Sequence, residues 1–141
     1  MDNTIYLIAK IKYLSDKYIA QKLKEIGIEE LVSSHGRILV VLFKYKSLTM
    51  SDLACKIEKD PSTVTTLVKK LIKLGYVEII KDEKDKRSNK VVLTQEGINL
   101  EDKMNNISKK MYDIQYNDIS DEDIIKFREI LEKMLENFSW E

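Results

Sequence analysis

The chain has few of the residues that characterise disulfide-stapled or membrane-spanning proteins. Its 141 residues include one cysteine, one proline, four glycines and one histidine. A single cysteine excludes an internal disulfide framework, and no apolar run approaches the ~20 residues that a membrane span requires. The first residues are acidic and interrupted by lysines, which is not typical of a signal peptide. These absences predict a soluble, cytoplasmic protein without membrane contact.

Patterns typical of catalysis and metal binding are also missing. His35 has no cysteine or carboxylate pair near it at ligand spacing, so we expect a local hydrogen bond at a helix N-terminus. The sequence contains no phosphate-binding loop and no nucleophile beside a base. It therefore predicts no metal, no cofactor and no enzymatic activity. For Cys55 we expect a partly buried, unreactive thiol, with redox activity as the alternative.

The charge is balanced overall but unevenly distributed. Lysine plus arginine and aspartate plus glutamate each number 24, giving a formal net charge of zero. Residues 61–90 carry eight basic and four acidic groups, a local excess of +4, whereas residues 91–141 carry six and twelve, a deficit of −6. A cationic surface for nucleic acid needs only such a local excess.

The spacing of apolar residues, caps and breakers predicts a mainly helical fold with a small β-hairpin. Asp60 suits a helix N-cap and Pro61 the first helical position, while Thr94 and Ser120 suit the caps of two later helices. The expected order is α-α-α-α-β-β-α-α. In chain order, the helices are expected at 3–26, from Ser33 or Ser34, at 51–58 and 61–74, the strands at 76–80 and 90–93, and the last helices at 95–116 and after Ser120.

Two short helices joined by a tight turn and followed by a hairpin predict a winged helix-turn-helix, in which the second helix enters the major groove of DNA. The apolar residues of that second helix are expected in the core, which leaves hydroxyls and lysines mainly on the opposite face. These core residues are Val64, Leu67, Val68 and Leu71. Any one of these is typical of an exposed helix, but their shared face favours DNA contact. The candidate DNA-facing residues are Ser62, Thr63, Thr65, Thr66, Lys69, Lys70 and Lys73.

The hairpin tip, KDEKDKRSN, provides the second candidate element. Arg87 is the only arginine between Arg37 and Arg128, and its planar guanidinium suits insertion into a narrow minor groove. Asp85 is placed to hold that side chain by a paired hydrogen bond. A solvated loop with a surface ion pair is the alternative. The further candidate DNA contacts of the hairpin are Lys84, Lys86 and Lys90.

The residues from Asp85 to Gly97 resemble the D-x-R…V-x-LT-x-x-G signature of the MarR family of transcription regulators. The match lies in Asp85-Lys86-Arg87, in Val91-Val92-Leu93-Thr94 and in Gly97. Pro61-Ser62-Thr63-Val64-Thr65, Gly75-Tyr76-Val77 and Ser34-His35-Gly36 also resemble segments of the family. Ser88 departs from it, because many members have a second basic residue directly after the wing arginine.

The resemblance implies a domain organisation and partners. Residues 1–30 and 95–141 would form dimerisation helices, and residues 31–94 a winged DNA-binding lobe. Apolar stripes in both terminal helices are wider than one small lobe needs, which favours a homodimer on a palindromic operator over a monomer with its own helical core. Members of the family often respond to small aromatic ligands. The candidate effector crevice comprises Tyr13, His35, Arg37, Ile38 and Tyr112.

We therefore predict a sequence-specific DNA-binding repressor released by a small-molecule effector. The alternative is a winged-helix module that binds another protein without sequence-specific DNA binding, for which Arg87 would have no role. The operator, the effector, the regulated genes and the choice between repression and activation are not encoded in any pattern of the sequence.

Overall fold

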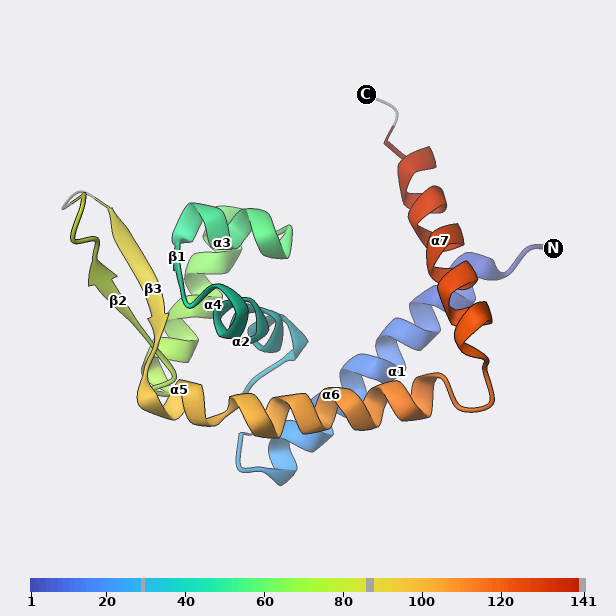
Figure 1. The fold of residues 1–141 in the computed structure, drawn as a ribbon, viewed down its shortest axis with the longest axis horizontal. Coiled ribbons are helices and arrows are strands. Elements are labelled where there is room, and N and C mark those ends of the chain that lie inside the picture. The colour runs from blue at the N-terminus through green and yellow to red at the C-terminus, as the bar shows by residue number, and fades with distance from the viewer. Residues whose placement is uncertain (29, 86–87, 140–141) are drawn as a thin grey trace. The chain divides into compact units, whose positions relative to one another are not determined.

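The computed structural model describes residues 1–28, 30–85 and 88–139 (Figure 1). The predicted order of elements is preserved, with a strand, β1, and a short helix, α5, in addition. The elements are α1 (Thr4–Glu25), α2 (Ser33–Tyr45), β1 (Ser47–Thr49), α3 (Met50–Ile57), α4 (Pro61–Lys73), β2 (Val77–Lys81), β3 (Asn89–Leu93), α5 (Gln95–Asn99), α6 (Glu101–Gln115) and α7 (Asp121–Asn137).

The chain forms two compact units, residues 1–107 and residues 108–141. The first unit contains α1 to α5, the sheet and the N-terminal part of α6. The second contains the rest of α6 and α7. Within the described ranges, no helix is both long enough and apolar enough to cross a membrane.

The core of the first unit lies between α2, α3, α4 and the sheet. Val64, Val68 and Leu71 of α4 are fully buried, which confirms the predicted inner face of that helix, and Leu67 packs partly buried against the same core. Burying one such aliphatic side chain contributes about 1.5–3 kcal/mol, so this cluster holds α4 in place. The other most deeply buried side chains are Leu23, Ile38, Leu39, Leu42, Leu53, Ile57, Val77 and Val91.

The hairpin of β2 and β3 is part of a three-stranded antiparallel sheet in the order β1-β3-β2. Leu48 of β1 lies opposite Val91 of β3, and both are buried. Val77 of β2, opposite Leu93, is buried on the same core. The pairing of β1 with β3 was not predicted. This pairing attaches the base of the hairpin to the residues that begin α3.

The helix predicted at 95–116 is interrupted, so that prediction was wrong in its continuity. Thr94 does cap its start, because its Oγ1 accepts a hydrogen bond from the N–H of Gly97 at 3.2 Å. At Leu100 the backbone N–H donates to the carbonyl of Gly97, three residues back, at 3.1 Å. Leu100 is buried in the core. A tightened turn at this buried residue separates α5 from α6.

The start of α2 also differs from the prediction, which placed a serine at its cap. The N-cap residue is Val32, and its N–H donates to Nδ1 of His35 at 3.0 Å. His35 therefore satisfies the free N–H at the start of α2, which confirms the expected local hydrogen bond of this histidine. Ser120 caps α7 as predicted, with its Oγ accepting from the N–H of Asp123 at 3.1 Å.

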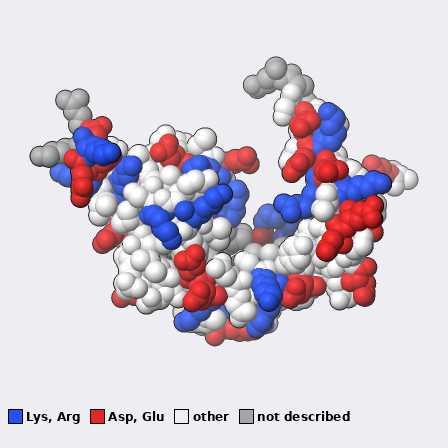
Figure 2. All heavy atoms as spheres, viewed as in Figure 1, with Lys and Arg blue, Asp and Glu red and all other residues white. Residues whose placement is uncertain are grey.

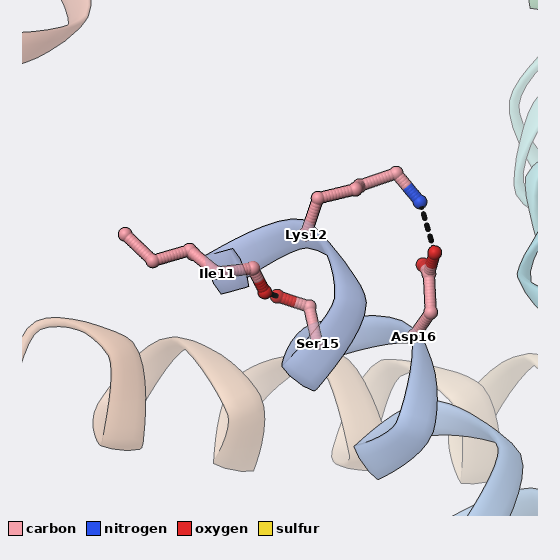
Figure 3. A network of polar contacts seen from close by, with 4 residues as sticks. All are labelled: Ile11, Lys12, Ser15 and Asp16. Carbon is pink, nitrogen blue, oxygen red and sulfur yellow. Dashed lines mark hydrogen bonds and ion pairs between the residues drawn. The ribbon is translucent and has the colours of Figure 1, made fainter. Parts of the chain in front are cut away.

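Helix α1 has one charged side and one apolar side. Lys12 and Asp16 form an ion pair one turn apart, and Oγ of Ser15 donates to the carbonyl of Ile11 at 2.8 Å (Figure 3). On the opposite side Leu7, Ile11 and Leu14 are exposed. The C-terminal end of the helix is different, because Leu23 is buried and belongs to the core. Only the N-terminal half of α1 thus carries an uncovered apolar stripe.

The second unit exposes several large apolar side chains. Ile124, near the start of α7, is buried, and the rings of Tyr112 and Tyr116 pack edge to face with centroids 4.7 Å apart. Phe127 and Leu135 of α7 are exposed, as is Phe138 directly after its end. Exposed apolar patches of this kind are typical of association surfaces.

Candidate nucleic-acid interface

A short turn positions α4 after α3. Glu58 adopts a left-handed conformation with φ of 55° and ends α3. Asp60 then caps α4, because its Oδ1 accepts from the N–H of Thr63 at 2.9 Å, and Pro61 occupies the first turn, where a missing N–H costs nothing. The predicted Asp-Pro start of the helix is confirmed. Its geometry orients α4 against α2 and α3 with one face outward.

Four of the candidate residues form the exposed stripe of α4. Ser62, Thr66, Lys69 and Lys73 are separated by four, three and four residues, which places them on one side of a helix. All four are exposed, whereas Val64, Val68 and Leu71 on the other side are buried. Thr63, Thr65 and Lys70 flank the stripe and are half-buried. The stripe thus presents hydroxyls in the first turns of the helix and ammonium groups towards its end.

The four hydroxyl groups of α4 each donate a hydrogen bond to the N-cap residue or to a backbone carbonyl of the helix. Ser62 Oγ donates to Asp60 Oδ1 at 2.5 Å, and Thr63 Oγ1 donates to Asp60 Oδ2 at 2.6 Å. Thr65 Oγ1 donates to the carbonyl of Pro61 at 2.8 Å, and Thr66 Oγ1 to that of Ser62 at 3.2 Å. The hydrogen bonds from Ser62 and Thr63 hold the pKa of the Asp60 carboxyl well below its usual range. Asp60 is therefore an anion at the start of α4 across the neutral pH range.

The lysines of α4 divide into two groups. Lys70 forms an ion pair with Glu30, forty residues earlier in the chain, and this pairing lowers the pKa of Glu30. Its ammonium group is thus directed to the segment before α2. Lys69 and Lys73 lie on the exposed stripe. Phosphate contacts by Lys69 and Lys73 stay a prediction, and a phosphate contact by Lys70 would have to compete with Glu30.

The described part of the hairpin tip is closed by its own backbone. The N–H of Asp82 donates to the carbonyl of Ser88 at 2.9 Å, and the N–H of Ser88 to that of Asp85 at 3.0 Å. Lys84 is exposed, and Nζ of Lys90 lies 3.7 Å from Oδ2 of Asp82. The candidate contacts Lys86 and Arg87 lie outside the described residues, and the predicted pairing of Asp85 with Arg87 therefore stays a prediction.

The LT-x-x-G part of the sequence signature joins the hairpin to α4. Thr94 Oγ1 donates to the carbonyl of Gly75 at 2.5 Å, and its N–H donates to the carbonyl of Tyr76 at 3.0 Å. A Cβ atom at Gly97 would lie 2.0 Å from the carbonyl oxygen of Tyr76, so only glycine fits there. Gly75 has φ of +83° and ends α4. These residues connect the base of the hairpin directly to the end of α4.

A basic cluster beside the helix-turn-helix was not predicted. Nζ of Lys56, on α3, lies 4.0 Å from the ring centroid of Tyr45, and Nζ of Lys44 lies 5.2 Å from it. The two ammonium groups, that of Lys44 first, lower the pKa of the Tyr45 hydroxyl. Figure 2 shows basic side chains gathered over α2 and α3 on the viewed face, whereas acidic and basic side chains alternate at the hairpin. Only the packing of α3 against the end of α2 brings these residues together.

The candidate effector residues fall into three environments. His35 and Ile38 are buried, while Arg37 and Tyr13 are exposed, all within the first unit. Burial is the main cause that lowers the pKa of His35, and the ammonium group of Lys70 adds to it. Tyr112 is exposed and belongs to the second unit. The effector crevice therefore stays a prediction.

Cys55 was expected to be partly buried, and this was wrong. The thiol is exposed on α3, whereas its neighbour Ala54 is buried. The inner face of α3 is formed by Leu53, Ala54 and Ile57, and one further residue along the helix turns the side chain about 100° away from that face.

Two short helices joined by a tight turn, followed by a hairpin, define a winged helix-turn-helix protein. The model of the MarR family matches residues 31–89. HTH-type transcriptional regulator SarZ of Staphylococcus saprophyticus is 30% identical over 116 residues, which span 79% of this chain and 77% of SarZ. The chain belongs to the MarR family.

Solved structures agree with this assignment. A MarR transcriptional regulator from Methanosarcina mazei superposes with a TM-score of 0.79 at 28% identity, covering 94% of this chain and 93% of that protein. The S. aureus MepR–DNA complex superposes with a TM-score of 0.86 at 24% identity, covering 97% and 99%. MepR was thus solved on DNA with the same fold.

Proposed function

We propose that this protein is a DNA-binding transcription repressor that acts in the cytoplasm as a homodimer. The observation that carries the proposal is the exposed stripe of α4. It combines hydroxyls in the first turns with Lys69 and Lys73, on a helix whose other face is locked into the core. An α-helix fits the major groove of B-DNA, and lysines that contact phosphates supply affinity. The hairpin extends the same lobe towards the adjacent minor groove.

The exposed apolar side chains of α1 and α7 support the homodimer. Leu7, Ile11 and Leu14 form a stripe on α1, and Phe127 and Leu135 belong to α7. A two-fold interface between such helices would place two recognition helices on the half-sites of a palindromic operator. Residues 1–30 and 95–141 would then serve dimerisation, and residues 31–94 DNA binding.

An effector would act by binding one conformation of the dimer better than the other. Within the first unit, Arg37 and Tyr13 are the exposed candidates for such a site, and His35 and Ile38 are the buried ones. A small aromatic anion would suit a site that offers a guanidinium group and a phenol ring. A panel of small phenolic carboxylates, titrated into the protein–DNA complex, should release DNA from the wild-type protein but less from Arg37→Ala. Equal release from both proteins would contradict this crevice.

The experiment that tests DNA binding is fluorescence anisotropy with a duplex from upstream of the gene and a scrambled duplex of equal length. Wild-type protein should prefer the upstream duplex, and its affinity should fall steeply with salt because counterions are released from phosphates. Arg87→Ala should weaken binding. Lys69→Ala should reduce the slope of log K against log salt by about one. Lys103→Ala, which removes an exposed lysine of α6, serves as the matched control.

Each outcome has a clear meaning. A salt-steep preference for the upstream duplex that is reduced in Arg87→Ala and Lys69→Ala supports the proposal. Equal binding to both duplexes would show a DNA-binding protein without preference for that operator. The absence of binding at low salt would contradict the proposal and favour a partner protein as the ligand of the winged lobe.

A further inference from the structure

The hydroxyl protons of α4 determine what the helix can offer to DNA. A serine or threonine hydroxyl has one proton to donate and two lone pairs that accept. Ser62 and Thr63 donate their protons to the ionised carboxylate of Asp60, at 2.5 and 2.6 Å. Thr65 and Thr66 donate theirs to backbone carbonyls one turn earlier, at 2.8 and 3.2 Å. All four hydroxyls are therefore left with lone pairs that accept and with no proton to donate outward.

This pattern disfavours partners that only accept hydrogen bonds. Phosphate oxygens are acceptors, and the carboxylate of Asp60 would repel them from the start of α4. Guanine also presents only acceptors, N7 and O6, in the major groove. A contact from Ser62 or Thr63 to either group would require the hydroxyl to leave a charge-assisted hydrogen bond.

The groups that remain available on the outward side match one kind of base pair. Thr66 lies on the exposed stripe and Thr65 flanks it. Because each Oγ1 is folded back onto the helix backbone, the methyl group and the oxygen lone pairs are left for contact. In the major groove an A·T pair presents both a donor, the adenine N6 amino group, and an apolar group, the thymine methyl. A G·C pair presents a donor on cytosine but no methyl group.

We propose that α4 selects A·T pairs through Thr66, with Thr65 beside it, by methyl–methyl contact and by accepting from adenine, and not by donating hydroxyl protons. This rests on the proposed DNA-binding function and specifies the side chains that determine its sequence preference. Asp60 is a positioning residue here, since it holds the protons of Ser62 and Thr63 and keeps phosphates from the helix end.

The test begins with the full chain and a random duplex library, from which bound sequences are enriched. In the enriched duplex each thymine is replaced in turn by deoxyuridine, which lacks the methyl group, and each adenine by purine, which lacks the amino group. Removing a thymine methyl in contact with threonine should weaken binding about fourfold, which corresponds to about 0.8 kcal/mol for one buried carbon.

Two variants separate the two contacts. Thr66→Ser keeps the hydroxyl and loses the methyl group, so it should abolish the deoxyuridine effect at the contacted thymine and retain the purine effect. Thr66→Val keeps the methyl group and loses the acceptor, so it should show the reverse. Thr4→Ser makes the same chemical change on α1 and should retain both effects. Circular dichroism spectra that match the wild type would show that the exposed substitutions leave the fold intact.

The outcomes distinguish this inference from the function on which it rests. Enrichment of A·T pairs, with each variant losing one of the two effects, supports it. Enriched duplexes in which deoxyuridine and purine are neutral at every position, or a preference for guanine that disappears in Thr66→Val, would overturn it while leaving DNA binding established. Failure to enrich any duplex overturns both.

Discussion

Helices α4 and α7 are both amphipathic, but only α4 has its apolar side covered. Val64, Val68 and Leu71 of α4 are fully buried, whereas Leu135 and Phe127 of α7 are 71% and 46% exposed in the single chain. The same helical periodicity thus gives α4 a buried apolar face and α7 an exposed one. The difference teaches that the winged lobe buries its apolar side chains within one chain, whereas association with a second chain would bury those of α7.

The largest effect on stability is expected from a substitution in the buried face of α4. Leu71→Ala should lower the free energy of unfolding by about 2–5 kcal/mol, because a fully buried leucine leaves a cavity in a packed core. Chemical denaturation measures this loss, which should not depend on protein concentration. Ile72→Ala, at the next position, which is 38% exposed, should cost less, about 1 kcal/mol, and serves as control. Equal losses at the two positions would contradict the assigned faces of α4.

A somewhat smaller effect is expected where the hairpin joins the lobe. Gly97→Ala places a Cβ atom 2.0 Å from the carbonyl oxygen of Tyr76, so the backbone must move. We expect a loss of about 1–3 kcal/mol in thermal or chemical unfolding, as for other overpacked sites. At Gly36 the nearest atom to a new Cβ is Cε of Met104 at 3.6 Å, so Gly36→Ala should be neutral or stabilising. A tolerated Gly97→Ala would refute the close approach.

The uncovered helix should respond in a different way. Leu135→Ala should reduce stability by about 1–2 kcal/mol per chain at protein concentrations where the dimer forms, because the side chain is then buried. At concentrations where the chain is monomeric, the effect should be close to zero. Thermal unfolding over a dilution series, with analytical ultracentrifugation on the same samples, measures both. A loss that is independent of concentration would show that α7 is covered within its own chain.

The smallest effect on stability is expected from a change of pH, through His35 of α2. Burial and Lys70 lower the pKa of His35 from its usual value of 6.5, and its Nδ1 accepts a hydrogen bond from Val32 only when unprotonated. The unfolded chain binds this proton more readily, so stability should fall as the pH drops below about 6.5. Unfolding measured between pH 7.5 and 5.5 should show this slope, and His35→Gln should remove it. The paired carboxyl of Glu30 titrates at lower pH and leaves this window unaffected.

The local part of the fold was predictable because short-range rules govern it. Asp60 and Pro61 marked the start of α4, and the spacing of Val64, Val68 and Leu71 marked its inner face. The interruption at Leu100 and the N-cap position of α2 at Val32 were missed because each depends on which side chain the core buries. The exposure of Cys55 was missed because neighbours on a helix point in different directions.

The candidate site was predictable to a similar degree. The exposed stripe of α4 followed from helical periodicity, whereas the ion pair of Lys70 with Glu30 was not predicted because the two residues lie forty positions apart. The commitment of the four hydroxyl protons was also missed, although three of the four acceptors belong to Asp60 and Pro61, directly before or at the start of the helix. Serine and threonine residues that directly follow an Asp-Pro helix start can therefore be expected, from sequence, to donate their hydroxyl protons to the capping carboxylate or to the first backbone carbonyls.

By itself, the sequence determined the order of elements, the two faces of α4 and the family, since these depend on residue type and spacing along the chain. Only the tertiary structure decided that β1 pairs with β3, that Thr94 and Gly97 fix the hairpin to Gly75 and Tyr76, and that Glu30 holds Lys70. Such contacts join residues far apart in sequence. Their formation depends on the free energy of packing the whole core, which no local pattern contains.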